Sequence, residues 1–237
     1  MKTQSIENSH KFEEIFVEKD VLENTITKNI LSFCKNATIN KIDNINDIIE
    51  KSDLPYPADS YGFKRLLIGK QRGPFLKPCP CSPDTIRCGY HFLRVGLGCP
   101  IDCSYCFLQG FLNTSFPVIY VNLDDLENEL SVWETDLKQK NDYIRLGTGE
   151  MIDSLAFEPI SHYARHLVKL FANLPHLILE LKTKTTFVET ILDIAIPNVV
   201  IGWSINPNRV ASIEEPNAPN LEERIKAASM AVKAGYN

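Results

Sequence analysis

The chain has 237 residues, of which 44% are hydrophobic and 23% are charged, proportions typical of a globular protein with a sizeable core. Its formal net charge of −5 excludes a generally basic protein that coats nucleic acid, and it is too mild for an acidic disordered chain. No apolar run approaches the roughly 18 residues of a membrane span, and the polar start has no signal-peptide core. We therefore expect a cytoplasmic protein without a membrane partner.

The chain is predicted to divide into three segments, at residues 1–60, 61–89 and 90–237. The first is a small N-terminal extension, helical or mixed, because Phe12–Lys19 and Val21–Cys34 carry apolar residues at helix-like spacing. Residues 52–61 contain two prolines and several small polar residues, which predicts a linker.

The second segment is a basic lead-in. Between Gly62 and Arg94, seven lysines and arginines face a single acid, Asp84. Two interpretations explain this excess equally well: a solvated basic loop, or a surface that binds phosphate or nucleic acid beside an active site. Both interpretations stay open at this point.

Strands and helices alternate in the third segment. Strands are predicted at residues 91–97, 143–146, 177–181 and 199–205, and helices at 124–140, 161–174, 186–194 and 220–234. The last helix has a capping box of Asn220 with Glu223 and ends at Gly235. Strands separated by helices imply right-handed crossovers and a parallel sheet. The predicted fold class is therefore α/β, a partial (β/α) barrel of about four βα units with its chemistry at the C-terminal strand ends.

Three cysteines follow the first predicted barrel strand at C-x3-C-x2-C spacing, Cys99, Cys103 and Cys106. Three thiolates on one loop can hold three irons of a [4Fe–4S] cluster, which otherwise takes four protein thiolates. The remaining iron then keeps an open position for a small molecule, as a catalytic zinc ion does. We favour this interpretation over a zinc site completed by His91 and over uncoordinated thiols.

The other four cysteines bring the total to seven, an odd number that argues against a disulfide framework. Cys79, Cys81 and Cys88 have C-x-C-x6-C spacing, which is unlike the common zinc and ferredoxin patterns. They are predicted to pack as small hydrophobic residues, with a second metal or the return of a hydrogen atom as alternatives. Cys34 is predicted to lie in the core.

The cysteine loop GCPIDCSYCFLQGFLN resembles that of the radical S-adenosylmethionine (SAM) superfamily, and within it the spore photoproduct lyase family. RLGTGEMIDSLAFE, WSINPNRV and LEERIKAASMAVKAGY resemble later segments of that family in the same order. The match covers roughly residues 60–237, with a weaker echo before them. The resemblance implies a radical SAM type of barrel with two cofactors, a [4Fe–4S] cluster and S-adenosyl-L-methionine. Reduction of the cluster would cleave SAM to methionine and a 5′-deoxyadenosyl radical that abstracts hydrogen from a substrate.

Site residues follow from the resemblance by position. Tyr105 is the aromatic residue usual before the last cluster cysteine, and it is the candidate catalytic residue. Gly147, Gly149 and Glu150 resemble the glycine-rich segment near the amino group of SAM, where glycines allow close approach and a carboxylate can accept from an ammonium. A tight turn with a helix-capping acid is the alternative.

Two later strand ends complete the predicted SAM site. Lys184 and Ser204 align with family residues at the methionine carboxylate, and Asn206 ends the same strand as Ser204. A surface lysine and an ordinary strand-end turn are the alternatives. Asp153 and Glu158 are predicted either to line the pocket or to cap helices.

Two positions depart from the family. The cysteine that returns a hydrogen atom corresponds by our alignment to Gly147, and a tyrosine that assists it corresponds to Phe107. Both changes point away from repair by the family mechanism and leave SAM cleavage untouched.

The sequence therefore predicts a radical SAM enzyme that abstracts hydrogen from a substrate, with damaged DNA as the leading class. An external reductant such as flavodoxin or ferredoxin is the other expected partner. The alternatives are a catalytically impaired iron–sulfur protein that binds nucleic acid, and a radical SAM enzyme with a non-DNA substrate. Because the family continues past KAGY into further strands, we expect a fragment or truncated product that ends at Asn237.

Overall fold

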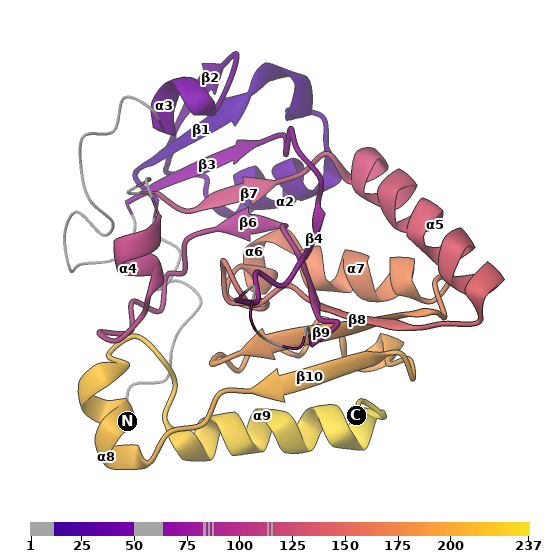
Figure 1. Cartoon of the computed structure of the whole chain (residues 1–237). Coiled ribbons are helices and arrows are strands. Elements are labelled where there is room, and N and C mark those ends of the chain that lie inside the picture. Colours follow the sequence, from indigo (N-terminus) through magenta and orange to yellow (C-terminus); the bar gives the residue numbers. More distant parts are fainter. Residues whose placement is uncertain are drawn as a thin grey trace.

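Two five-stranded sheets organise the chain (Figure 1). The computed structural model describes residues 12–49, 64–82, 84, 86, 88–112, 114 and 116–237. The first sheet has the order β2-β1-β3-β7-β6, with β1 at Glu14–Glu18, β2 at Thr38–Ile42, β3 at Arg65–Gly69, β6 at Gly96–Leu97 and β7 at Val118–Tyr120. The second has the order β10-β9-β8-β5-β4, with β4 at Leu76–Pro78, β5 at His91–Leu93, β8 at Ile144–Gly147, β9 at Leu177–Thr183 and β10 at Val199–Trp203. The predicted linker at 52–61 lies outside the described residues.

Most strand pairs are parallel. β1 pairs with β2 and β3, and β3 with β7, while β5 pairs with β8, β8 with β9 and β9 with β10. Only β6–β7 and β4–β5 are antiparallel among the described strands. The α/β class is confirmed, and the described strands form a partial barrel that does not close.

Helices cover both sheets. Their bounds are η1 Lys19–Val21, α2 Thr25–Phe33, α3 Asn46–Ile49, α4 Leu108–Phe111, α5 Leu123–Lys140, α6 Glu158–Ser161, α7 Tyr163–Phe171, η2 Leu192–Ile194, α8 Asn208–Glu214 and α9 Leu221–Ala234. Helix α7 packs on β9, α9 packs on β10, and α2 packs on α6. The predicted caps of α9 are confirmed, since Asn220 and Glu223 form a capping box and Gly235 has a φ of 104°. None of the described helices has the length and apolarity that crossing a membrane requires.

The N-terminal helix predicted at Phe12–Lys19 is wrong, because these residues form β1. Ile15 and Val17 are fully buried whereas Phe16 between them is half-buried, which is the alternation of a strand. The second predicted helix is present as α2, and it begins after Asn24, whose side chain accepts a hydrogen bond from the Ile26 amide at 2.9 Å. β1 and β2 thus share a sheet with strands of later segments, and the three-segment division stays a prediction.

Two further predictions in the third segment need correction. Only the short turn η2 forms within the helix predicted at residues 186–194. The strand predicted at residues 91–97 is two strands, because the chain bends at Val95, whose amide donates to the Leu93 carbonyl at 3.0 Å. β5 therefore lies in the second sheet and β6 in the first. The cysteine loop that follows β6 consequently begins where the chain has just passed between the sheets.

The crossing between the sheets has no room for a side chain at Gly96. A Cβ atom there would lie 2.6 Å from the Val118 carbonyl oxygen and 3.0 Å from Ile152 Cδ1. Because the oxygen belongs to the backbone of β7, we expect Gly96→Ala to lower the free energy of unfolding by about 1–3 kcal/mol, measured by urea denaturation. Gly73→Ala is the matched control, since nothing lies within 4 Å of its Cβ position. Equal stability of the two variants would contradict this account of the crossing.

Candidate functional site

The three cysteines of the loop after β6 open onto one cavity of about 300 Å³. Its lining also includes residues that follow β8, β9 and β10, the parallel strands whose C-terminal ends meet at this edge. The lining residues are Cys99, Ile101, Asp102, Cys103, Tyr105, Cys106, Phe107, Leu108, Gln109, Gly149, Glu150, Ile152, Asp153, Lys182, Lys184 and Ser204. Among the residues predicted for the site, Gly147, Glu158 and Asn206 lie outside this lining. The sequence predictions thus converge on a single cavity.

The cysteine loop is held by its own polar groups. Asp102 has a φ of 52°, a left-handed conformation that is uncommon for residues other than glycine. The Gln109 side-chain amide donates to the Cys103 carbonyl at 2.8 Å and to Asp102 Oδ1 at 3.2 Å. The Cys106 amide also donates to the Cys103 carbonyl, at 2.9 Å. These contacts fix the turn that separates the cysteines.

The cavity suits a thiolate-bound cluster of several metal ions. Cys103 is buried, and Cys99 and Cys106 are half-buried. Burial raises the pKa of Cys103 to about 11, against the opposing effect of the nearby Lys184 ammonium. Burial also raises the pKa of Cys99, so loading metal here must release protons. Among the described residues these three sulfurs are not gathered within 4.8 Å of one another, as ligands of different irons need not be.

The two carboxylate oxygens of Glu150 differ in their hydrogen bonding. Its Oε1 accepts from the Tyr90 hydroxyl at 2.6 Å and from Lys182 Nζ at 3.1 Å. Its Oε2 is buried and accepts no hydrogen bond from the described residues. A buried acceptor of this kind at a cavity wall calls for a donor. The ammonium of a bound amino acid group would supply one.

Gly147 makes room for the Tyr90 side chain and does not line the cavity. A Cβ atom at Gly147 would lie 1.9 Å from the Tyr90 hydroxyl oxygen, so the absence of a side chain makes room for that ring. Gly149, two residues further on, does line the cavity. Of the three residues predicted in the glycine-rich segment, Gly149 and Glu150 line the cavity and Gly147 does not.

Asp153 orients the turn that carries Lys184. Its carboxylate accepts from the Lys184 amide at 2.7 Å, from the Thr183 hydroxyl at 2.8 Å and from the Leu155 amide at 3.0 Å. Burial raises the pKa of this carboxyl group above its usual value. The Lys184 ammonium then lies 5.7 Å from the centre of the Tyr105 ring, at the cavity wall. A cation placed here can bind a carboxylate.

Tyr105 and Asn206 belong to a network that the sequence did not reveal. The Asn206 side-chain amide donates to the Tyr105 hydroxyl oxygen at 3.0 Å and to Glu215 Oε1 at 2.8 Å. The Tyr105 hydroxyl donates to Glu215, and the Arg224 guanidinium donates to the same carboxylate and to the Ser204 carbonyl, the latter at 2.9 Å. Asn206 therefore positions Tyr105 from outside the cavity.

The Glu215 carboxylate is charged in spite of its burial. Burial tends to raise its pKa, but hydrogen bonds from Tyr105, Arg224 and Asn206 outweigh burial and hold the pKa below its usual value. Glu215 itself belongs to none of the motifs identified in the sequence. The feature that marks Glu215 is its burial together with Arg224. This feature is visible only in the tertiary structure.

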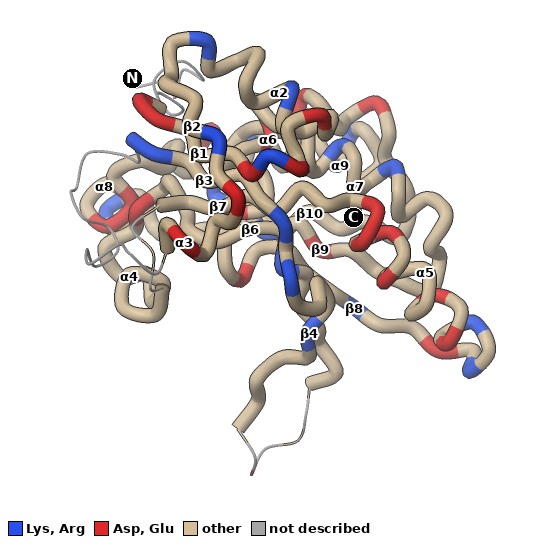
Figure 2. Tube along the Cα trace, turned by 90° about the horizontal axis from the view of Figure 1, so that it is seen from above, with Lys and Arg blue, Asp and Glu red and all other residues tan. Residues whose placement is uncertain are grey.

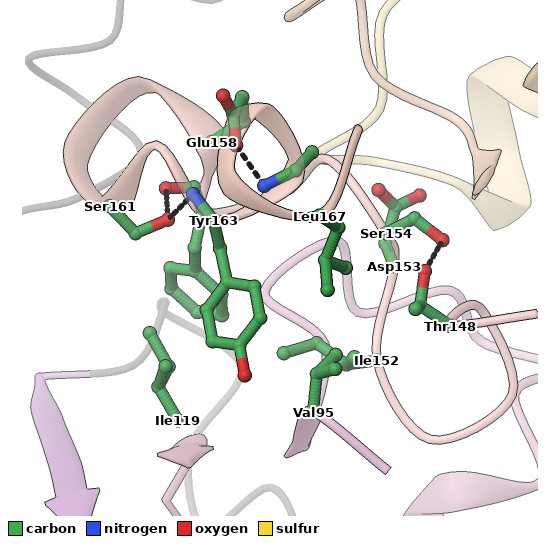
Figure 3. A pocket seen from close by; sticks show the side chains of 12 residues that line it. Val95, Ile119, Thr148, Ile152, Asp153, Ser154, Glu158, Ser161, Tyr163 and Leu167 are labelled. Carbon is green, nitrogen blue, oxygen red and sulfur yellow. Dashed lines mark hydrogen bonds between the residues drawn. The ribbon is translucent and has the colours of Figure 1, made fainter. Parts of the chain in front are cut away.

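A second, smaller cavity of about 30 Å³ lies beside α6 and α7 (Figure 3). Asp153 lines both cavities, whereas Glu158 lines only the smaller one. Glu158 accepts from the Ala164 amide at 2.6 Å and from the Arg165 amide at 3.2 Å, so it caps the start of α7. Burial raises the pKa of Glu158 to about 7. This space is about the volume of one water molecule, so it is no substrate site.

Much of the basic lead-in is neutralised by the N-terminal segment. Four of the seven basic residues between Gly62 and Arg94 form ion pairs with the N-terminal segment, and none of these four pairs exceeds 2.9 Å. The pairs are Lys64–Glu13, Arg65–Glu14, Lys70–Asp20 and Arg72–Glu18. The local excess of positive charge in the sequence is therefore much reduced on the described surface.

The other cysteines lie away from the large cavity. Cys34 is buried, as predicted. Cys79 and Cys81 are half-buried and Cys88 is exposed. None of these three belongs to the described core, so the predicted packing role is not supported.

Comparisons with known proteins identify relatives over most of the chain. A family model described as spore photoproduct lyase matches residues 11–237. The spore photoproduct lyase of Clostridium acetobutylicum is 25% identical over 233 residues, covering 95% of this chain and 66% of that protein. A solved spore photoproduct lyase complexed with dinucleoside spore photoproduct has a TM-score of 0.78 at 19% identity, covering 96% of this chain and 66% of that one. A substituted form with bound AdoMet and dinucleoside spore photoproduct has a TM-score of 0.76 at 19% identity, covering 95% and 65%.

The partial barrel and its cysteine loop define a protein of the radical SAM class. The family match extends over nearly the whole chain. The chain belongs to the spore photoproduct lyase family, and it spans about two thirds of the length of the relatives it matches.

Proposed function

We propose that the chain carries the SAM-cleaving centre of a radical enzyme whose substrate is damaged DNA. One observation carries the proposal: three cysteine thiols share a cavity wall with Gly149, Glu150, Lys184 and Ser204. Thiols supply the ligands of an iron–sulfur cluster, while a carboxylate and an ammonium supply complementary contacts for an amino acid group. Family membership supports the same assignment.

Cys99, Cys103 and Cys106 are proposed to hold one [4Fe–4S] cluster. When bound and reduced, this group supplies the electron that cleaves SAM to methionine and a 5′-deoxyadenosyl radical. The protein's own groups bind and orient SAM. The free oxygen of Glu150 accepts from its ammonium, and the Lys184 ammonium, held in place through Asp153, binds its carboxylate.

The remaining wall of the cavity is suited to exclude water. Ile101, Leu108 and Ile152 contribute apolar surface beside the cysteines. Tyr105 closes the same wall with its hydroxyl engaged by Glu215 and Asn206. A radical formed in such a space is shielded from side reactions.

Damaged DNA is proposed as the substrate because solved relatives are described with dinucleoside spore photoproduct bound. The return of a hydrogen atom is the step in which this chain is proposed to differ. Among the described residues that line the cavity, the only cysteines are the three of the loop, and Phe107 offers no hydroxyl. A flavodoxin or ferredoxin is the proposed reductant.

Anaerobic turnover tests the proposal. Reconstituted protein with a reductant and SAM is expected to form 5′-deoxyadenosine, faster with ultraviolet-irradiated DNA than with the same DNA unirradiated. DNA deuterated in its thymine residues should pass deuterium into the 5′-deoxyadenosine, which identifies the source of the abstracted hydrogen. Formation of 5′-deoxyadenosine without any response to irradiated DNA would contradict the substrate. Absence of 5′-deoxyadenosine from cluster-loaded protein would contradict the reaction.

A nucleic-acid-binding protein without catalysis is the second candidate. The basic lead-in favours it, although four of its charges are paired internally. DNA affinity that falls steeply with salt, without SAM cleavage, would establish this alternative.

A further inference from the structure

Three cysteines outside the large cavity come together at the base of the β4–β5 loop. The sulfur atoms of Cys79, Cys81 and Cys88 all lie within 4.8 Å of one another, and Cys81 Sγ is 3.6 Å from Cys88 Sγ. We propose that these three thiols bind one zinc ion. This site is separate from the cysteines of the proposed SAM-cleaving centre.

The sulfur spacing suits a single ion. Zinc binds thiolate sulfur at about 2.3 Å in tetrahedral geometry, so two sulfurs on one ion are about 3.8 Å apart. The observed 3.6 Å between Cys81 and Cys88 is close to this edge. It is also far longer than a disulfide bond of about 2.05 Å, and all three cysteines are free.

The hairpin, rather than the spacing along the chain, brings these thiols together. Pro78 at the end of β4 pairs with His91 at the start of β5. Beyond that pair the Cys79 amide donates to the Tyr90 carbonyl at 2.8 Å, and the Cys81 amide donates to the Cys79 carbonyl at 2.8 Å. The two arms of the loop are thereby held side by side. Cys79 and Cys88, the first and last residues of a ten-residue segment, can therefore bind the same ion.

The surroundings favour a metal over an apolar contact. Cys88 is exposed and its two partners are half-buried, and the described part of the chain that follows β4 extends away from the rest of the fold (Figure 2). Sulfur ligands select zinc over the oxygen-seeking ions magnesium and calcium. Binding replaces three thiol protons by one Zn²⁺, with release of three protons and no change of oxidation state. The fourth position is left to water or an added ligand.

The test must separate this site from the iron–sulfur centre. We would prepare the full chain with Cys99, Cys103 and Cys106 all replaced by alanine, and measure zinc by elemental analysis and X-ray absorption. One zinc per chain with sulfur at about 2.3 Å is expected. Replacement of zinc by cobalt should give the visible bands of a tetrahedral thiolate site. None of these readouts depends on SAM cleavage, so they remain informative if the proposed function fails.

Single substitutions locate the ion. In that background Cys79→Ser, Cys81→Ser and Cys88→Ser are each expected to weaken zinc binding more than about 100-fold, the upper end of what an outer-shell change costs. Cys34→Ala, which also removes one thiol, is expected to leave zinc bound. Less than half an equivalent of zinc, or retention unaffected by the three serine variants, would overturn the proposal. A Cys81–Cys88 disulfide in protein alkylated at lysis would overturn it as well.

Discussion

Replacing Cys103 by alanine is expected to abolish reductive SAM cleavage. Cys103 is the buried member of the three cavity cysteines, and its carbonyl holds the loop through Gln109 and the Cys106 amide. Loss of one thiolate leaves two protein ligands where the proposed cluster has three. Iron content after anaerobic reconstitution and 5′-deoxyadenosine formation should both fall to background.

Cys34→Ala is the matched control for this experiment. Cys34 lies at the end of α2 and does not line the cavity, so iron loading and turnover should be retained. Formation of 5′-deoxyadenosine by Cys103→Ala would show that the cluster is held elsewhere. The zinc measurement on the β4–β5 loop would be unaffected by either result.

The largest expected effect on stability belongs to Arg224. Its side chain is 1% exposed, and that of its partner Glu215 is fully buried. Arg224→Met removes the guanidinium paired with this buried carboxylate and leaves only the Lys184 ammonium, 4.0 Å from Glu215 Oε1, so we expect the free energy of unfolding at neutral pH to fall by about 3 kcal/mol. Urea denaturation measures this loss. Arg209→Met on the exposed side of α8 should cost less than about 0.5 kcal/mol.

The dependence on pH distinguishes charge from packing. In the unsubstituted chain the pKa of Glu215 is below its ordinary value of 4.5, so Glu215 adds stability above pH 4.5 that is lost as the pH falls through its lowered pKa. Without Arg224 fewer contacts oppose the effect of burial, so the pKa of Glu215 should be higher than in the unsubstituted chain. The deficit of Arg224→Met should therefore shrink as the pH falls below about 4.5.

A second substitution provides the complementary test. Arg224→Met combined with Glu215→Gln removes the buried negative charge yet keeps an oxygen that can accept from Tyr105 and Asn206. The pair should therefore recover most of the stability lost by Arg224→Met alone. No recovery in the double variant, together with a deficit independent of pH, would assign the loss to packing.

The sequence predicted those parts of the site that depend on local spacing or on strand ends. Cys99, Cys103 and Cys106 are close because they share one short loop. Lys184 and Ser204 could be placed beside them because parallel strands bring their C-terminal ends to one edge. The structure places all five at one cavity.

The contacts that were missed link residues far apart in the chain. Glu215 follows Tyr105 by 110 positions, and the two meet because the cysteine loop contacts the end of α8, where the Ser104 amide donates to the Glu214 carbonyl at 2.9 Å. The sequence also did not show that the Tyr90 ring occupies the space beside Gly147 where a side chain would lie. These two residues meet through the pairing of β5 with β8. Neither contact produces a periodic pattern or a characteristic spacing in the sequence.

The N-terminal strand was missed because two periodicities compete there. Phe12, Ile15 and Phe16 match a helix, whereas Ile15 and Val17 match a strand. Pairing with β2 and β3 decides between them by burying the second pair. Similarly, Cys79 and Cys88 meet because of the hairpin ladder, which their spacing alone did not disclose.

The left-handed turn at Asp102 bears on the thermodynamics of cofactor loading. A loop that had to fold around its metal would lose chain entropy on binding, and this loss would weaken the measured affinity. Here the left-handed Asp102 and the Gln109 side-chain amide, which donates to the Cys103 carbonyl and to Asp102 Oδ1, hold the turn through contacts within the polypeptide. Part of the entropic cost of ordering the loop is therefore met by the polypeptide's own hydrogen bonds, which favours binding of iron by the three thiols.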